Sequence, residues 1–269
     1  MKVGFLGFGE VSRVLSRKLM AEGVEAYTCT EERSLKTRQN ALDLGVKLCE
    51  SLEEVAEISD ITISAVVPGA TVEVSKKVGN SVKGVYVDMN SVSPFTVKEA
   101  LSFVENGKTV DASIMGSIKK GADVKIVASG SFAESFAELN QYGMNINIVG
   151  PDLGQASALK MLRSVYTKGV SALLFESLYT AYKMGIDDIL LKYLSETECP
   201  GFKESAISRI MSSELNAKRR AQEMLEVVKV VSEYTDPVMS RATLEFFQMI
   251  SKKQGKSNYE KIFHGFSDD

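Results

Sequence analysis

Two glycines and a serine near the start of the chain could bind the phosphates of a nucleotide. Gly7 and Gly9 follow the apolar run KVGFL, and Ser12 stands where a helical pattern begins. In a dinucleotide-binding loop the first glycine permits a sharp turn, the second lets the backbone approach the pyrophosphate, and a third small residue allows close helix–strand packing. The helix N-terminus offers N–H groups to the anion. The residues expected to contact the cofactor are Gly7, Phe8, Gly9, Glu10 and Val11.

A G-x-G-x-x-S run alone is also compatible with a simple turn, or with a loop that binds S-adenosylmethionine. Its place ahead of a strand–helix series favours a dinucleotide. The next strand pattern ends at Thr28 and Thr30, with no acid before Glu31 to hold ribose hydroxyls, so NADP is preferred and NAD remains the alternative. Three cations that could neutralise a 2′-phosphate follow, unless they only solvate a helix: Arg33, Lys36 and Arg38. Thr28, Thr30 and Arg33 complete this part of the expected cofactor site.

The chain lacks the histidine and cysteine sets that many active sites use. His264 is the single histidine, and Cys29, Cys49 and Cys199 are widely spaced without a C-x-x-C pair. This excludes a Ser-His-Asp triad and a multi-histidine metal site, and disfavours a disulfide framework. We expect no metal, and the acid–base group of any enzyme here must be another side chain.

The composition is that of a soluble globular protein. Of 269 residues, 44% are hydrophobic and 25% charged, and the formal net charge is −3. The length suggests two domains, and the charge gives no reason to expect nucleic acid as a partner. Because the apolar runs are too short to span a bilayer and no targeting pattern precedes the first strand, we expect no membrane association and a cytoplasmic location.

Strand and helix patterns alternate up to Gly150, and beyond about Ala156 the periodicity is helical. Strand patterns cover residues 2–6, 25–29, 46–48, 60–67, 84–88, 109–113, 123–129 and 145–149. Helical patterns of the second half cover residues 156–184, 187–195, 202–234 (with a break near Ser213) and 237–254. This order predicts an α/β fold: an N-terminal Rossmann-type, doubly wound and largely parallel sheet over residues 1–152, then an all-α domain over residues 153–269. We expect the last dozen residues to be loosely ordered.

Four further motifs follow in a characteristic order: SAVVPGA (64–70), VDMNSVSP (87–94), DASIMGS (111–117) and GQASALKMLRS (154–164). The set resembles the β-hydroxyacid dehydrogenase family, in particular an archaeal branch with its own helical C-terminal domain. The resemblance covers nearly the whole chain. It implies an NAD(P)-dependent oxidoreductase that acts on a small, anionic 3-hydroxy acid or its semialdehyde, and a homodimer.

The resemblance also assigns residues to the two ends of the site. The nicotinamide end of the cofactor is expected against Val66, Val67, Pro68 and Asn90, and the substrate against Ser91, Met115, Gly116, Ser117 and Ser164. In the substrate loop, Gly116 matches the family pattern D-x-P-x-S-G-G. Ser113, Met115 and Ser117 replace its proline, serine and second glycine, and Ser164 replaces an asparagine. These departures leave the substrate unnamed.

Lys160 matches the catalytic lysine of the family, and it also suits the chemistry. Oxidising an alcohol by hydride transfer requires removal of the hydroxyl proton, and carbonyl reduction requires its return. A lysine that is partly desolvated near a cationic nicotinamide has a lowered pKa and can do both. Lys160 lies in the otherwise apolar run ASALKML, four residues before Ser164 on the same helical face. The alternative is a surface lysine on an amphipathic helix.

Two other functions remain open. A dinucleotide-binding sensor or regulator without catalysis would account for the altered substrate loop, and an imine reductase could use the same architecture. The retained Lys160 argues against both. Three adjacent cations, Lys218, Arg219 and Arg220, could guide an anionic substrate, although a solvated helix face is the expected arrangement.

Overall fold

The computed structural model describes residues 1–31, 33–118, 121 and 123–253. The chain divides into two compact units, Met1–Lys160 and Met161–Asp269. The division falls within a long helix, whereas the domain boundary predicted from the sequence precedes that helix. The predicted looseness of the last dozen residues, and His264, lie outside the described residues.

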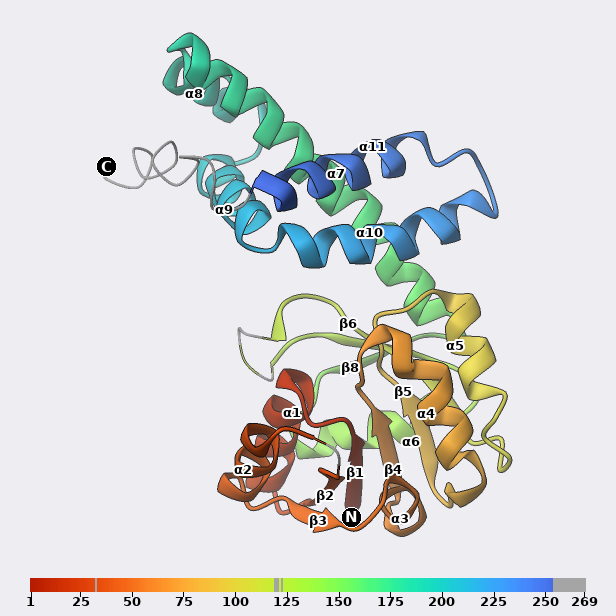
Figure 1. Cartoon of the computed structure of the whole chain (residues 1–269). Coiled ribbons are helices and arrows are strands. Elements are labelled where there is room, and N and C mark those ends of the chain that lie inside the picture. Colours follow the sequence, from red (N-terminus) through yellow and green to blue (C-terminus); the bar gives the residue numbers. More distant parts are fainter. Residues whose placement is uncertain (32, 119–120, 122, 254–269) are drawn as a thin grey trace. The chain divides into compact units, whose positions relative to one another are not determined.

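The first unit contains an eight-stranded sheet, which confirms the predicted doubly wound α/β fold (Figure 1). The strands are β1 (Lys2–Leu6), β2 (Glu25–Cys29), β3 (Lys47–Cys49), β4 (Ile61–Ser64), β5 (Val85–Asp88), β6 (Thr109–Ile114), β7 (Ile126–Ser129) and β8 (Ile146–Gly150). Their order across the sheet is β3-β2-β1-β4-β5-β6-β7-β8. Neighbouring strands are parallel except β6 and β7, which are antiparallel.

Helices cover both faces of this sheet. One face carries α1 (Glu10–Ala21), α2 (Leu35–Asp43) and α6 (Ala133–Ala137), and the other carries α3 (Leu52–Ile58), α4 (Thr71–Val78) and α5 (Pro94–Leu101). Phe5 of β1 joins the core on the first face with Leu15 and Phe136, and Leu6 joins the core on the second face with Val78. Because both faces are covered, the central strands β4, β5, β6 and β7 are buried along their whole length.

The carboxyl edge of the sheet collects the loops that the sequence singled out. The chain leaves β1 towards β2 and β3 on one side, while β4 and β5 continue the sheet on the other. In open parallel sheets, ligands bind at such a switch point, outside the carboxyl ends of the strands. The loops after β1, β4, β5 and β6 bring Gly7, Val66, Ser91 and Gly116 to this edge.

The second unit is helical, as predicted. The helices are α7 (Gln155–Met184), whose first turns belong to the first unit, α8 (Asp187–Thr197), α9 (Phe202–Leu215), α10 (Ala217–Ser232) and α11 (Val238–Lys253). The predicted break near Ser213 lies at Asn216, whose side-chain amide donates to the carbonyl of Ser212. Ile210, Met224 and Phe247 are among the residues of its core. None of the described helices has the length and apolarity needed to cross a membrane.

Candidate active site at the carboxyl edge of the sheet

The glycine loop after β1 is fixed by its neighbours. Gly7 has a φ of +84°, and a Cβ at this position would lie 2.8 Å from the carbonyl oxygen of Ala65 and 2.9 Å from Cγ1 of Val66. Ser12 is fully buried and its Oγ donates to the carbonyl of Gly7 at 2.6 Å. Ser12 therefore closes the loop by a hydrogen bond. The sequence predicted only a packing role for Ser12, because its side chain is small.

The surface over Gly9 is open and suits an anion. Gly9 is exposed, and a Cβ built on it would meet nothing within 4 Å. It is also the N-cap of α1 without a side-chain hydrogen bond, so no side chain of the cap competes for the first N–H groups of the helix. Phe8 is 5% exposed and packs in the core, so any contact that it makes with a ligand must come from its backbone.

The end of β2 corrects one expected cofactor contact. Thr28 is fully buried, and its Oγ1 donates to the carbonyl of Phe5 at 2.8 Å inside the sheet. Any contact that Thr28 makes with a cofactor must therefore come from its backbone. Thr30 is nearly buried, but its carbonyl accepts from the N–H of Arg33 at 3.1 Å and forms a turn that leaves the Arg33 side chain exposed.

A row of buried polar side chains crosses the sheet close to this edge. Ser64, Asp88, Asp111 and Ser129 occupy register positions on β4, β5, β6 and β7, and all four are fully buried. Buried polar groups need hydrogen-bond partners, because their desolvation is costly. Asn90 and Ser157 supply most of these partners. Asn90 also fixes the loop after β4, and Ser157 the start of α7, at the edge of the sheet.

Asn90 completes the row on the side of β4. Its Nδ2 donates to Ser64 Oγ at 3.0 Å and to Asp88 Oδ2 at 2.9 Å, and its Oδ1 accepts from the N–H of Val66 at 2.7 Å. Asn90 was expected to face the nicotinamide, but it is 2% exposed and its amide holds the loop after β4. That loop carries Val67, which is 70% exposed, and the exposed Pro68.

Asp111 completes the row on the other side and anchors α7. Its Oδ2 accepts from the N–H of Ser157 at 2.9 Å, and its Oδ1 accepts from Ser157 Oγ at 2.6 Å. Ser129 Oγ lies 3.4 Å from Asp111 Oδ2 and accepts from the N–H of Ala156 at 3.1 Å. A carboxylate that binds the N–H groups of a helix N-terminus makes a charge-assisted bond and complements the helix dipole. The helix that carries Lys160, three residues beyond Ser157, is therefore fixed to β6 and β7.

Burial raises the pKa of both carboxyl groups. The pKa of Asp88 rises to about 7, mainly through desolvation and further through the charge of Asp111, while the hydrogen bonds from Asn90 oppose the shift. Burial also raises the pKa of Asp111, and the hydrogen bonds from Ser157 oppose this rise. Two like charges on neighbouring strands of a dry sheet repel each other, which favours the protonated form of one of the two carboxyl groups.

The remaining site residues are distributed over two loops and one helix. Ser91, which follows β5, is half-buried. Met115 is half-buried after β6, Gly116 has a φ of +152° and is exposed, and Ser117 is exposed. On α7, Lys160 and Ser164 are half-buried, Lys160 as the last residue of the first unit and Ser164 within the second.

Comparisons with known proteins identify the family. Residues 2–91 match the model of NADP oxidoreductases, coenzyme F420-dependent, and residues 181–250 match the domain of unknown function DUF1932. A solved protein of unknown function, described as similar in structure to 3-hydroxyacid dehydrogenases, is 46% identical with a TM-score of 0.83. The match covers 96% of this chain and 100% of that chain. The chain belongs to the β-hydroxyacid dehydrogenase-like family. The predicted family resemblance is thereby confirmed.

Two further relatives extend the comparison. An uncharacterised 28.5 kDa protein of Methanothermus fervidus is 41% identical over 253 residues, which are 94% of this chain and 100% of that protein. The 2-(hydroxymethyl)glutarate dehydrogenase of Eubacterium barkeri is 30% identical over 200 residues, which are 69% of this chain and 65% of that enzyme. The relatives support a nicotinamide-dependent dehydrogenase fold for this chain.

The raised pKa of Asp88 predicts a pH-dependent stability. The folded protein keeps this proton up to about pH 7, whereas the unfolded chain loses it near about pH 4, so the contribution of Asp88 to stability is lost as the pH rises between these values. Asp88→Asn removes this titration. Its free energy of unfolding relative to the parent protein should rise by about 3 kcal/mol from about pH 5 to about pH 8. Urea unfolding at both pH values measures this, with the exposed Asp43→Asn as control; parallel profiles for parent and Asp88→Asn would contradict it.

The anchoring of α7 predicts a local effect of Asp111→Asn. The substitution removes the charge at the helix N-terminus and puts an amide donor where Ser157 needs an acceptor, so the first turn should open more often. Amide hydrogen exchange at Ala156 and Ser157 should become at least about tenfold faster, and Ser157→Ala, which loses one bond, should have a smaller effect. Unchanged exchange in Asp111→Asn would show that the carboxylate does not hold the helix.

Proposed function

We propose that this chain transfers a hydride between NADP(H) and a small 3-hydroxy acid or the corresponding semialdehyde, with Lys160 as the acid–base group. The observation that supports this most strongly is the anchoring of α7 by Asp111, because it fixes the helix of Lys160 to the edge that carries the glycine loop. Membership of the dehydrogenase-like family supports the same chemistry.

The residues at the glycine loop fit a dinucleotide. The open surface over Gly9 and the N-terminus of α1 accommodate a pyrophosphate, which Glu10 and Val11 would bind through backbone N–H groups. Arg33, exposed after β2, is the nearest cation along the chain for a 2′-phosphate, and it supports NADP over NAD. The bound nicotinamide supplies the hydride acceptor or donor. Val66, Val67 and Pro68 form the loop proposed to pack against that ring.

The proton has to move separately from the hydride. In the oxidation, the substrate hydroxyl gives its proton to Nζ of a neutral Lys160 while its carbon gives up a hydride, and a carbonyl forms. In the reduction, Lys160 returns the proton to the oxygen. Lys160 is half-buried and close to the fixed start of α7, which favours a defined position for Nζ. The substrate contacts proposed are Ser91, Met115, Gly116, Ser117 and Ser164.

The two alternatives make different predictions. A regulatory dinucleotide-binding protein would bind the cofactor and be indifferent to the loss of Lys160, and an imine reductase would turn over imines rather than hydroxy acids. The homodimer and the anionic nature of the substrate also stay predictions.

The cofactor is tested first, by calorimetric titration of the protein with NADP, NADPH, NAD and NADH. NADP and NADPH should bind more tightly than NAD and NADH, and Arg33→Ala should weaken only the phosphorylated pair, by about tenfold for the loss of one charge-assisted contact. Arg17→Ala, which removes an exposed positive charge from α1, is the matched control. If none of the four bound at millimolar concentration, the glycine loop would be a turn only.

The chemical step is tested with a panel of small 3-hydroxy acids and semialdehydes. Lys160→Ala should lower kcat by about 10²–10⁴-fold, the usual contribution of a general acid–base, while cofactor affinity stays within about twofold. Arg163→Ala, an exposed cation on the same helix, should leave turnover unchanged. An active Lys160→Ala variant would rule out this role of the lysine, and turnover of imines alone would favour the imine reductase.

A further inference from the structure

The second unit holds a group of cationic side chains that the proposed reaction does not use. Lys168 of α7, Arg209 of α9, and Arg219 and Arg220 of α10 form this group, which we call the cation cluster. The sequence predicted a solvated face for the run that ends at Arg220. Lys218 and Arg219 are exposed as expected, but Arg220 is half-buried and contacts α9 and α11.

Within the described part of the chain, the two terminal nitrogens of Arg220 bind hydroxyls rather than a carboxylate. Its Nη1 donates to Ser213 Oγ at 2.8 Å, and its Nη2 donates to Ser212 Oγ at 2.7 Å. The guanidinium carbon lies 5.4 Å from the ring centroid of Phe247. Two hydroxyls and a ring orient the guanidinium but do not neutralise it. A guanidinium has five N–H donors, so the fork retains donors for a further acceptor.

One carboxylate, that of Glu223, is shared between two cations of the cluster. Its Oε2 lies 3.1 Å from Lys168 Nζ, and its Oε1 lies 2.7 Å from Arg219 Nη1. Among the described residues, Glu223 thus makes two ion pairs in this group, with Lys168 and with Arg219. Burial, together with the charges of Arg219 and Arg209, lowers the pKa of Arg220 to about 10, and the charge of Glu223 opposes this shift. Burial likewise lowers the pKa of Lys168, which is 9% exposed, and Glu223 opposes this shift.

The cluster is accessible and its geometry is fixed. Arg209 and Arg220 are half-buried, and the side chain of Arg219 is 63% exposed. Arg209 Nη1 donates to the carbonyl of Thr167, next to Lys168, at 3.3 Å, which ties α9 to α7.

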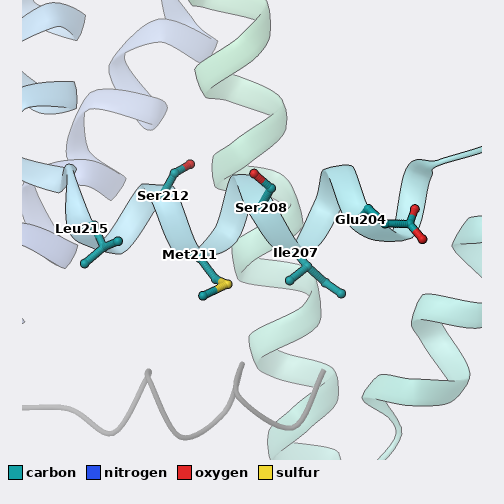
Figure 2. Close-up of a pocket in the computed structure, with 6 residues that line it drawn as sticks. All are labelled: Glu204, Ile207, Ser208, Met211, Ser212 and Leu215. Carbon is teal, nitrogen blue, oxygen red and sulfur yellow. The ribbon is translucent and has the colours of Figure 1, made fainter. Parts of the chain in front are cut away.

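Figure 2 shows the other surface of α9, where Ile207, Met211 and Leu215 project away from the side that bears Ser212. These residues and Ser212 line a hollow of about 490 Å³.

We propose that the cation cluster binds an oxyanion, a phosphate or carboxylate group of a small molecule, with the guanidinium of Arg220 as its main contact. A partly desolvated guanidinium is stabilised by a negative partner, and a bound oxyanion would supply one. A planar guanidinium matches the two oxygens of a phosphate or carboxylate, and the neighbouring cations add attraction. The site involves the second unit alone, so it stands independently of the proposed hydride transfer.

The test is calorimetric titration of the full chain with inorganic phosphate and, separately, with malonate, at a constant ionic strength set with chloride. At least one anion should bind, and Arg220→Gln should weaken that binding by about tenfold or more. Lys218→Gln removes an equal charge from an exposed position of the same helix, and it should change the affinity by less than about twofold. Tighter binding of phosphate would assign a phosphorylated ligand, and tighter binding of malonate a carboxylic acid.

Further variants keep the outcomes distinct. Lys160→Ala should retain the anion affinity. Failure of the hydride-transfer proposal can therefore be distinguished from failure of the anion-binding proposal. If Arg220→Gln fails to fold, as judged by circular dichroism, Arg219→Gln replaces it, since the Arg219 side chain is largely exposed and its loss should also weaken binding severalfold. Absence of binding of both anions, or equal affinities in Arg220→Gln and Lys218→Gln, would overturn the proposal.

Discussion

The buried polar row across β4 to β7 is the constraint on which the candidate site depends. A dry sheet tolerates Asp88 and Asp111 on neighbouring strands only if each carboxyl group is hydrogen-bonded and the pair avoids carrying two full charges. Asn90 satisfies one carboxyl group, and Ser157 the other. The partners that satisfy the row are therefore also the groups that fix the loop after β4 and the start of α7.

This arrangement links the glycine loop to Lys160, the proposed acid–base group, through the sheet. Gly7 approaches Ala65 and Val66 too closely for a side chain, and Val66 is in turn held by Asn90. On the other side, Asp111 holds the first turn of α7. Each bond is short in space but joins segments far apart in the chain, so the edge of the sheet behaves as one rigid frame. A rigid frame favours catalysis, because misplacement of a reacting group by about 1 Å is costly in rate.

Local patterns in the sequence were sufficient for the fold class, the glycine loop and most strands, because these depend on apolar periodicity and on residues next to each other. They were insufficient where the hydrogen-bond partner lies far away in the sequence. The hydrogen bond between Asp111 and Ser157 joins residues 46 positions apart, and no local pattern near either residue predicts it. Strand pattern carries no direction, so antiparallel β7 was not foreseen. Thr28 alternates with its neighbours as a strand residue should, but which face it takes depends on register with β1.

The cation cluster shows the same limit for electrostatics. A net charge of −3 argues against an extended polyanionic partner, because such binding depends on the field of a whole surface. It says nothing about a small anion, which responds to charges within a few ångströms in a partly desolvated place. Three helices converge so that Lys168, Arg209 and Arg220 share a space in an otherwise acidic protein. Recognition of a small oxyanion is thus compatible with an acidic chain, because local packing rather than composition sets the charge that such a ligand meets.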